Sequence, residues 1–271
     1  MKQIRGGIVA TGGIAAKFAE ACLFESSRTG RSIIQAVASR DPKKAADFAK
    51  QWHIGRHYGS YAELFADPEI DADYNATPHH SHASLSIAAL EAGKAVLCEK
   101  PVSLTLDEFK PVIEAAKRNN RFFMEAMWMK FNPTFRKALS WIGEGYIGEP
   151  KFIRSDFFLD APFNPESRYY DPALGGGALL DVGIYPVTCA LVVAGSRKPS
   201  YLTAIMHTGA TGVDLYNKAH MVWDNGFIAD LSSAINLQGL EELRSAVIIG
   251  ETGSIILPLF WMAQESALFD A

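Results

Sequence analysis

Short apolar runs alternate with segments of helical periodicity over the first part of the chain. Residues 4–10 have the composition of a short buried strand, a glycine-bearing turn follows at residues 11–13, and residues 14–24 carry apolar side chains at helical spacing. A second apolar run at residues 32–39 predicts the next strand. A strand, a helix and a strand at this pitch are typical of a right-handed parallel unit.

The same alternation continues to about residue 125. Asp41-Pro42 predicts a helix start with a side-chain cap, and Ser60 and Thr105 each precede a glutamate by three residues, which predicts two capping boxes. The further predicted helices are residues 61–65, 84–92 and 107–118, and the further predicted strands are residues 70–76, 95–98 and 122–126. We therefore predict an α/β dinucleotide-binding domain over residues 1–126, with a doubly wound parallel sheet of the Rossmann type.

The pattern changes after Trp128. A helical segment at residues 135–142 leads into an extended segment at 150–159, a loop rich in proline and tyrosine, and three glycines at 175–177. Long segments with β character follow at residues 202–207, 218–223, 226–236 and 245–249, separated by glycine turns. This predicts an α+β domain with a mostly antiparallel open sheet over residues 127–271.

Composition and charge narrow the class of protein. Hydrophobic residues make up 48% and charged residues 21%, which is typical of a globular protein, and the net charge of −4 argues against a nucleic-acid partner. The three cysteines are far apart, so we expect neither a zinc site nor a disulfide framework. No apolar run approaches the ~18 residues that a membrane helix needs. The start of the chain leaves no room for a signal peptide, so we expect a cytoplasmic protein.

The turn after the first strand is a candidate phosphate-binding loop. The dinucleotide fingerprint has glycine at three positions, and the matching residues here are Ala10, Gly12 and Ala15, so only the middle glycine is kept. The helix that starts beyond Gly13, at Ile14, can still offer backbone N–H groups and its dipole to a phosphate. An ordinary strand-to-helix turn is the alternative interpretation of this loop.

The end of the second strand bears on the choice of cofactor. NAD-specific domains carry an acidic residue there to bind the adenosine ribose. This chain has Ser39 and Arg40, and a guanidinium suits a ribose 2′-phosphate. Asp41 is better explained as the helix cap. A solvated arginine at a strand end is the alternative, and NADP is favoured over NAD.

Three further segments carry a family resemblance. Residues 77–82 (TPHHSH), 98–101 (CEKP) and 175–186 (GGGALLDVGIYP) follow the Rossmann start in this order. The chain thereby resembles the glucose–fructose oxidoreductase, inositol dehydrogenase and rhizopine catabolism family (Gfo/Idh/MocA). It is most similar to the dihydrodiol dehydrogenase and D-xylose dehydrogenase branch, with which it also shares AVLCEKP, MEAMW and residues 211–214.

The resemblance implies roles for particular residues. Lys100 would reach the nicotinamide and the substrate oxygen, Tyr185 would be the acid–base residue, and Asp181 would lie one helical turn before it. The resemblance also implies that most relatives in the sugar-oxidising branches carry histidine where this chain has Tyr185, whereas tyrosine is typical of the dihydrodiol branch. The segments that border the nicotinamide would include Thr77, Pro78, His79, His82 and Glu99.

The chemistry agrees with these residue types. Removing hydride from a carbinol carbon requires a group that accepts the hydroxyl proton. A tyrosine with a pKa of about 10 is a poor base, but a nearby ammonium such as that of Lys100 lowers the pKa of a phenol. The alternatives are a surface lysine and a packed tyrosine. The spacing of His79, His80 and His82, without a carboxylate or cysteine cluster, does not indicate a metal site.

We therefore expect an NADP-dependent oxidoreductase that acts on a CH–OH group of a polyol, an aldose such as D-xylose, or a trans-dihydrodiol, with further substrate contacts from Arg168 or Tyr169. An NAD-dependent inositol or amino-sugar dehydrogenase and a non-catalytic NADP-binding sensor are the rival hypotheses. Relatives imply a homodimer or homotetramer formed through the C-terminal sheet, near residues 218–236. They also run longer, which predicts a C-terminal truncation. The substrate, the direction of hydride transfer and the number of subunits stay open.

Overall fold

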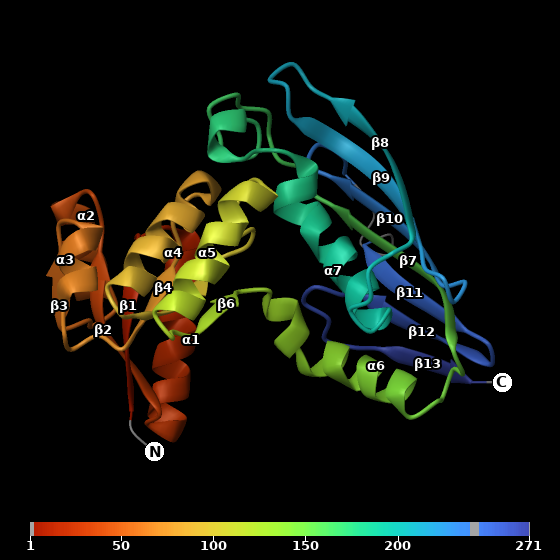
Figure 1. Cartoon of the computed structure of the whole chain (residues 1–271), viewed down its shortest axis with the longest axis horizontal. Helices are drawn as coiled ribbons and strands as arrows, with labels where there is room; N and C mark the ends of the chain where they lie inside the picture. Colours follow the sequence, from red (N-terminus) through yellow and green to blue (C-terminus); the bar gives the residue numbers. More distant parts are fainter. Residues whose placement is uncertain (1–2, 239–243, 271) are drawn as a thin grey trace. The chain divides into compact units, whose positions relative to one another are not determined.

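The structure is a computed structural model that describes residues 3–238 and 244–270. The chain divides into two compact units, an N-terminal unit (Met1–Ala126) and a C-terminal unit (Met127–Ala271). Figure 1 labels the elements of both. Each unit has its own sheet and its own buried core.

The N-terminal unit is built on a six-stranded sheet in the order β3-β2-β1-β4-β5-β6, and its neighbouring strands pair in parallel. The strands are β1 (Ile4–Val9), β2 (Ser32–Ala38), β3 (Arg56–Tyr58), β4 (Ala72–Asn75), β5 (Ala95–Cys98) and β6 (Phe123–Glu125). This is the strand order of dinucleotide-binding domains, and the order reverses between β1 and β4, where such domains bind their ligand. The predicted doubly wound α/β fold is confirmed.

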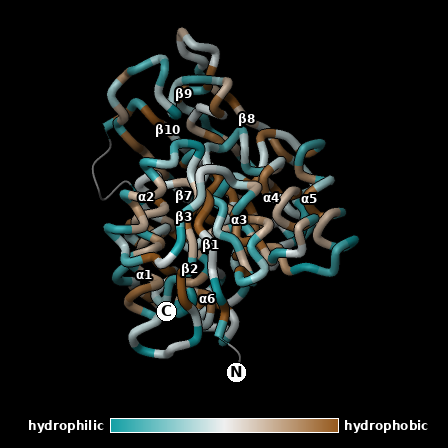
Figure 2. Tube along the Cα trace, turned by 90° about the vertical axis from the view of Figure 1, so that its left-hand side faces the viewer, coloured by the Kyte–Doolittle hydropathy of each residue, from teal (hydrophilic) through white to brown (hydrophobic). Residues whose placement is uncertain are grey.

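Helices cover both faces of this sheet (Figure 1). They are α1 (Gly13–Thr29), α2 (Pro42–Gln51), α3 (Tyr61–Ala66), α4 (His82–Glu91), preceded by the short η1 (His79–Ser81), and α5 (Leu106–Arg118). Neighbouring strand residues point to opposite faces, so Ile8 packs with α1 and α2 while Val9 packs with α3, α4 and α5. Hydrophobic and hydrophilic residues alternate along α5 in Figure 2, as expected for a helix that buries one face, here through Val112, Ala115 and Ala116.

The helix starts confirm most of the predicted caps. The Asp41 carboxylate accepts hydrogen bonds from two backbone N–H groups of α2, and Ser60 and Glu63 form a reciprocal capping box. The second predicted capping box is wrong in one half. Thr105 accepts from the N–H of Glu108, but the Glu108 carboxylate accepts from the N–H of Leu104, one residue before the cap.

The C-terminal unit contains a seven-stranded sheet in the order β13-β12-β11-β7-β10-β9-β8. The strands are β7 (Pro150–Phe158), β8 (Tyr201–Thr208), β9 (Asp214–Val222), β10 (Ile228–Ala234), β11 (Ser245–Gly250), β12 (Gly253–Pro258) and β13 (Ala267–Asp270). β7 and β10 pair in parallel and the other neighbours are antiparallel. The predicted mostly antiparallel open sheet is confirmed.

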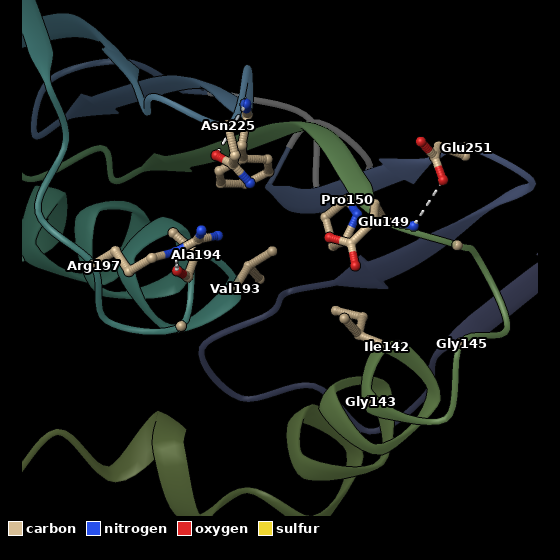
Figure 3. A pocket seen from close by; sticks show the side chains of 13 residues that line it. Ile142, Gly143, Gly145, Glu149, Pro150, Val193, Ala194, Arg197, Asn225 and Glu251 are labelled. Carbon is tan, nitrogen blue, oxygen red and sulfur yellow. Dashed lines mark hydrogen bonds between the residues drawn. The ribbon is translucent and has the colours of Figure 1, made fainter.

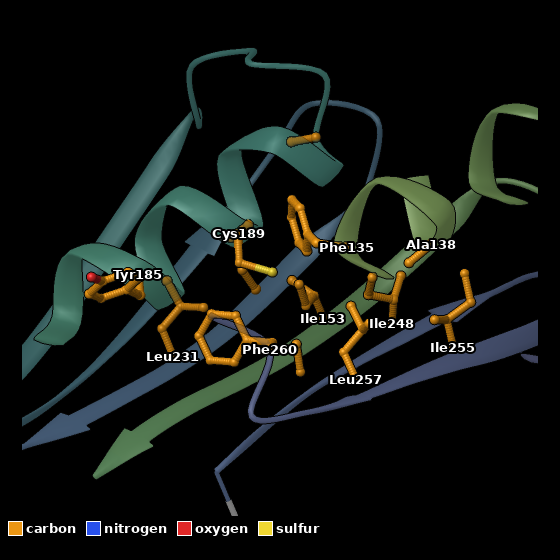
Figure 4. Close-up of a cluster of buried hydrophobic side chains, with 14 of the residues drawn as sticks. Phe135, Ala138, Ile153, Tyr185, Cys189, Leu231, Ile248, Ile255, Leu257 and Phe260 are labelled. Carbon is orange, nitrogen blue, oxygen red and sulfur yellow. The ribbon is translucent and has the colours of Figure 1, made fainter. Parts of the chain in front are cut away.

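One face of this sheet is covered by α6 (Pro133–Gly143) and α7 (Ile184–Val193) (Figure 1). Figure 4 shows Phe135 of α6 and Cys189 of α7 within the buried cluster, and Tyr185 lies at one end of it. A π-helical turn (η4, Leu179–Gly183) leads directly into α7. The shorter 3₁₀ turns of the unit are η2 (Trp128–Phe131) and η3 (Pro172–Leu174). In the described part of the chain, no helix covers the other face of the sheet.

The helical stretch Pro172–Val193 is long and apolar enough to cross a membrane by length and composition alone, with a mean hydropathy of 1.7 over its most apolar window. The expectation that no such stretch exists is therefore wrong. Within that window 56% is buried inside the unit, because α7 packs against the sheet. A buried core helix passes the same composition test, so this stretch is explained by packing.

Candidate active site

The predicted cofactor residues of the N-terminal unit follow the carboxyl ends of four strands, β1, β2, β4 and β5. Backbone hydrogen bonds join these strand ends to one another. They run from the N–H groups of Ala10, Ala76 and Glu99 to the carbonyls of Ala38, Val9 and Asn75, at 2.9, 3.0 and 2.9 Å respectively. The four segments therefore lie side by side at one edge of the sheet, around the position where the strand order reverses.

The start of α1 is open. Gly12 is the N-cap and provides no side-chain hydrogen bond, whereas α2, α3 and α5 each have a side-chain cap. A Cβ built on Gly12 or Gly13 would meet no heavy atom within 4 Å. The N–H groups and positive dipole end of α1 can therefore be approached closely, and the site fits the pyrophosphate of a dinucleotide.

Ala10 occupies the position of the first fingerprint glycine and adopts a backbone conformation that favours glycine. Its φ is +88°, in the left-handed region that residues with a Cβ rarely adopt. A glycine would adopt this turn freely, whereas Ala10 does so at a cost on the order of 1 kcal/mol in backbone strain.

The end of β2 carries an exposed cation, Arg40, and a carboxylate, Asp41, that already accepts hydrogen bonds from backbone N–H groups. The Ser39 hydroxyl accepts from the N–H of Asp41, and the Asp41 carboxylate accepts from the N–H groups of Lys43 and Lys44. Arg40 is exposed and makes no hydrogen bond or ion pair with the residues that the structure describes. Asp41 is a helix cap, as expected from the sequence.

The segment after β4 is tied to the segment after β5 by His82. Its side chain is fully buried, with Nδ1 2.6 Å from the Pro101 carbonyl oxygen and Nε2 2.6 Å from the Thr77 carbonyl oxygen. Burial lowers the pKa of the His82 imidazole, and the two carbonyl contacts oppose this change. Because both ring nitrogens contact backbone carbonyl oxygens, His82 holds the segment after β4 against the segment after β5.

The neighbouring predicted residues differ in exposure. The Thr77 hydroxyl donates to Asn75 Oδ1 at 2.8 Å, and both side chains are buried. His79 is buried with its ring centre 5.7 Å from that of His82, whereas Pro78 is exposed. Of these residues, Pro78 has an exposed side chain, and the carbonyl oxygen of Thr77 is in contact with His82.

Glu99 is turned into the unit. Its carboxylate accepts from the Tyr74 hydroxyl, whose ring stacks on Phe18, and from the N–H of Lys100 at 3.3 Å. Burial raises the pKa of Glu99, and the hydrogen bond from Tyr74 partly offsets that effect. Lys100 is half-buried at the end of β5. Glu99 therefore holds the backbone that presents Lys100.

In the C-terminal unit the Tyr185 hydroxyl accepts a hydrogen bond from Nε1 of Trp128 at 2.9 Å. The Phe157 ring lies 5.5 Å from the Tyr185 ring and stacks on Trp261 at 3.6 Å. The indole donor of Trp128, and the two rings contributed by β7 and the segment after β12, were missed because no local pattern in the sequence links them to Tyr185.

Asp181 and Tyr185 are brought together on one helical run. Asp181 is buried in the π-helical turn, and its carboxylate accepts from Arg168 at 2.7 Å. The Arg168 guanidinium also donates to the Tyr169 hydroxyl at 2.8 Å and lies over the Tyr169 ring. The carboxylate of Asp181 raises the pKa of Arg168 against the opposing effect of burial. The two residues suggested as substrate contacts therefore adjoin the predicted catalytic helix.

A separate cavity of about 580 Å³ lies near the C-terminal ends of α6 and α7 (Figure 3). Its lining includes Ile142, Glu149, Arg197 and Asn225, and none of the predicted site residues. Within residues 3–238 and 244–270, no group of three or more histidine, cysteine, aspartate or glutamate side chains could hold a metal ion.

Comparison with known families identifies the class of protein. Residues 4–127 match the GFO/IDH/MocA oxidoreductase family with an NAD-binding Rossmann fold, and residues 135–256 match the GFO/IDH/MocA C-terminal domain. The chain belongs to this family, and the predicted NAD(P)-dependent oxidoreductase is confirmed.

The chain is also similar to individual proteins of known name or structure. It is 36% identical to trans-1,2-dihydrobenzene-1,2-diol dehydrogenase of Xenopus laevis over 262 residues, which cover 97% of this chain and 77% of that protein. A solved levoglucosan dehydrogenase, in complex with NADH and levoglucosan, has a TM-score of 0.87 at 25% identity, covering 95% of this chain and 74% of the other. A 3-ketoreductase from Actinomadura kijaniata, in complex with NADP and TDP-benzene, shares the fold at a TM-score of 0.85 and 24% identity, covering 100% and 85%.

Proposed function

We propose that this oxidoreductase transfers hydride between NADP and the CH–OH carbon of a small polyhydroxylated substrate, a trans-dihydrodiol or an aldose such as D-xylose. The observation that carries the proposal is the hydroxyl of Tyr185, held by Trp128 and one helical turn from the Asp181–Arg168 pair. A dihydrodiol is favoured because Trp128 and Phe157 place aromatic rings beside Tyr185, against which an unsaturated carbon ring would pack.

The residues of the chain divide the remaining work. NADP, when bound, supplies the hydride acceptor. In the oxidative direction Tyr185 takes the proton of the substrate hydroxyl, and Lys100 donates a hydrogen bond to the substrate oxygen. Asp181 orients the substrate through a neighbouring hydroxyl, with Arg168 holding the carboxylate in place.

The experiment is a turnover assay of the whole chain at 340 nm with trans-dihydrodiols, D-xylose, other aldoses and inositols, each with NADP⁺ and with NAD⁺. We expect turnover of at least one dihydrodiol or aldose, and a loss of ~100-fold or more in kcat for Tyr185→Phe and Lys100→Met, with NADPH affinity retained. Unchanged turnover in Lys100→Met would contradict its role. Tight NADP binding without turnover of any substrate would favour a sensor.

The preference for NADP is supported by Ser39 and Arg40 at the end of β2 and by the use of Asp41 as a cap. Fluorescence titration should give tighter binding of NADPH than of NADH. Arg40→Ser should weaken NADPH binding by ~10- to 100-fold and change NADH binding little, because only NADPH carries the 2′-phosphate. Arg31→Ser, at the opposite end of β2, is the matched control. Tighter NADH binding by the unaltered chain would favour the NAD-dependent rival.

We also propose that copies of the chain associate through the uncovered face of the C-terminal sheet. Tyr201 and Ile205 of β8 are 60% and 72% exposed, and Ile228 of β10 is 39% exposed. Sedimentation velocity should detect a dimer or tetramer that Ile205→Asp dissociates. Leu106→Asp, on an exposed leucine of α5, is the matched control. A chain that sediments as a monomer at micromolar concentration would contradict this part of the proposal.

A further inference from the structure

The helical run that carries Asp181 and Tyr185 receives its N-terminal cap from a distant residue. The run starts after Gly177, and its own residues provide no side-chain cap. The carboxylate of Asp214, the first residue of β9, accepts a hydrogen bond from the N–H of Leu179 at 2.9 Å. A carboxylate at this place satisfies one of the unpaired N–H groups of the first turn and complements the helix dipole.

The three consecutive glycines at 175–177 make room for this contact. Gly177 has a φ of +117°, and a Cβ there would lie 2.3 Å from Oδ1 of Asp214. A Cβ on Gly176 would lie 2.8 Å from the Tyr169 carbonyl oxygen. The glycine segment therefore passes tightly between Asp214 and the loop that contains Arg168.

Asp214 is itself anchored to the sheet. Nδ2 of Asn217 donates to its Oδ2 at 2.7 Å, and the Ser233 hydroxyl donates to Oδ1 of Asn217 at 3.0 Å. The same Ser233 hydroxyl lies where a Cβ on Gly183 would come within 2.6 Å of it. The side chains of Asp214, Asn217 and Ser233 thus connect β9 and β10 to both ends of the π-helical turn, at Leu179 and at Gly183.

The position of a π-helical turn decides how the side chains around it are directed. An extra residue within one turn rotates the following residues relative to a regular α-helix, and such turns are frequent at functional sites. Asp181 lies inside the turn and Tyr185 follows it in α7. We propose that Asp214 is a positioning residue, which fixes the start of the π-helical turn and thereby the directions of Asp181 and Tyr185. This inference rests on the proposed function for its catalytic part.

The test uses the whole chain with a substrate that it turns over. Asp214→Ala removes the acceptor for Leu179, and kcat should fall ~10- to 100-fold, as expected for a small misplacement of the reacting groups. The pH profile of kcat should shift, since Tyr185 is displaced, whereas NADPH affinity should stay within about twofold. Hydrogen exchange should accelerate for the amides of residues 178–185.

Exchanging the side chains of Asp214 and Asn217 tests whether restoring their contact also restores kcat. Asp214→Asn keeps an oxygen that can accept from both Leu179 and Nδ2 of Asn217 but removes the negative charge beside the helix start, so kcat should be intermediate. Asp214→Asn with Asn217→Asp restores one carboxylate facing one amide, and kcat should return to within about threefold of the unaltered chain. Thr105→Ala, which removes the cap of α5, is the control for a lost cap and should leave the pH profile unchanged.

The outcomes separate this inference from the proposed function. An inactive Tyr185→Phe together with unaltered kcat, pH profile and amide exchange in Asp214→Ala would overturn the positioning role. Full turnover by Tyr185→Phe would overturn the proposed function instead. If Asp214→Ala does not fold, Asp214→Asn and the double variant decide: a double variant no better than Asp214→Asn would overturn the inference.

Discussion

Helix α1 and the helical run that leads into α7 each begin after a glycine, and these two glycines, Gly12 and Gly177, serve opposite purposes. At α1, Gly12 has empty space in front of it and no side chain caps the helix. At the run that leads into α7, the space beside Gly177 is filled by Asp214, which supplies the cap. The open start suits an external anion, whereas the closed start fixes the side chains of its own helix. Whether a glycine at a helix start leaves room for a ligand or for a capping side chain therefore depends on what lies opposite it.

A second contrast involves two aspartates that each face a glycine. A Cβ on Gly7 would lie 2.4 Å from Oδ1 of Asp73 in β4, much as a Cβ on Gly177 would approach Asp214. The Asp73 carboxylate is buried without a hydrogen-bond partner among the described residues, and burial raises its pKa to about 7. The Asp214 carboxylate accepts two hydrogen bonds. Only the second aspartate is expected to stabilise the fold when it is charged.

The largest expected effect comes from closing the open helix start. Gly12→Asp places a carboxylate where the pyrophosphate is proposed to bind, and NADPH affinity should fall by ~1,000-fold or more. The introduced carboxylate would also cap α1, so the melting temperature of the variant should be unchanged or higher. Isothermal titration and calorimetry measure the two quantities. Gly55→Asp, where a Cβ also meets open space, is the control. Retained NADPH binding would show that the phosphate lies elsewhere.

The next effect concerns the unpaired aspartate. Asp73 keeps its proton to about pH 7 in the folded state and loses it near pH 3.8 when unfolded, so it costs stability increasingly as the pH rises between these values. From pH 4 to pH 8 the unaltered chain should lose about 4 kcal/mol relative to Asp73→Asn, in urea unfolding. Asp47→Asn, on the exposed side of α2, controls for the lost charge. Parallel pH curves for the unaltered chain and Asp73→Asn would refute the burial argument.

The smallest effect tests the strained turn before α1. Ala10→Gly replaces a residue at a φ of +88° by the one residue that adopts it without strain, and the unfolding free energy should rise by up to about 1 kcal/mol. NADPH affinity should not fall, because the loop already has this conformation. Ala16→Gly, inside α1, should destabilise by a similar amount. A destabilised Ala10→Gly would mean that the turn is not strained.

The fold was predictable where local signals agree. Asp41-Pro42 and the pair Ser60 and Glu63 predict their helix starts correctly, since a cap depends on residues within one turn. The short strand β3 was missed, because Arg56-His57-Tyr58 lacks an apolar run and is ordered by pairing with β2. The partner of the Glu108 carboxylate was missed for a different reason. The backbone N–H groups of Leu104 and Thr105 are both within its reach, and the residue types do not decide between them.

The candidate site was predictable as a set of segments and less so as contacts. Asp181 and Tyr185 share one helical run, and Lys100 follows a strand end, which the sequence order already indicates. The cap from Asp214 to Leu179 spans 35 residues and joins a strand to a helix, so no periodicity predicts it. The contacts of His82 are with backbone carbonyls, and residue type says nothing about these acceptors.

Hydride transfer itself provides the most direct test of the proposed function. A dihydrodiol or aldose that the chain turns over is prepared with deuterium on the carbinol carbon and incubated with NADP⁺, and the nicotinamide product is examined by mass spectrometry and NMR. Deuterium is expected at C4 of the reduced nicotinamide, with transfer ~100-fold or more slower in Tyr185→Phe. Reduced cofactor without deuterium, or equal transfer by Tyr185→Phe, would contradict the proposed function.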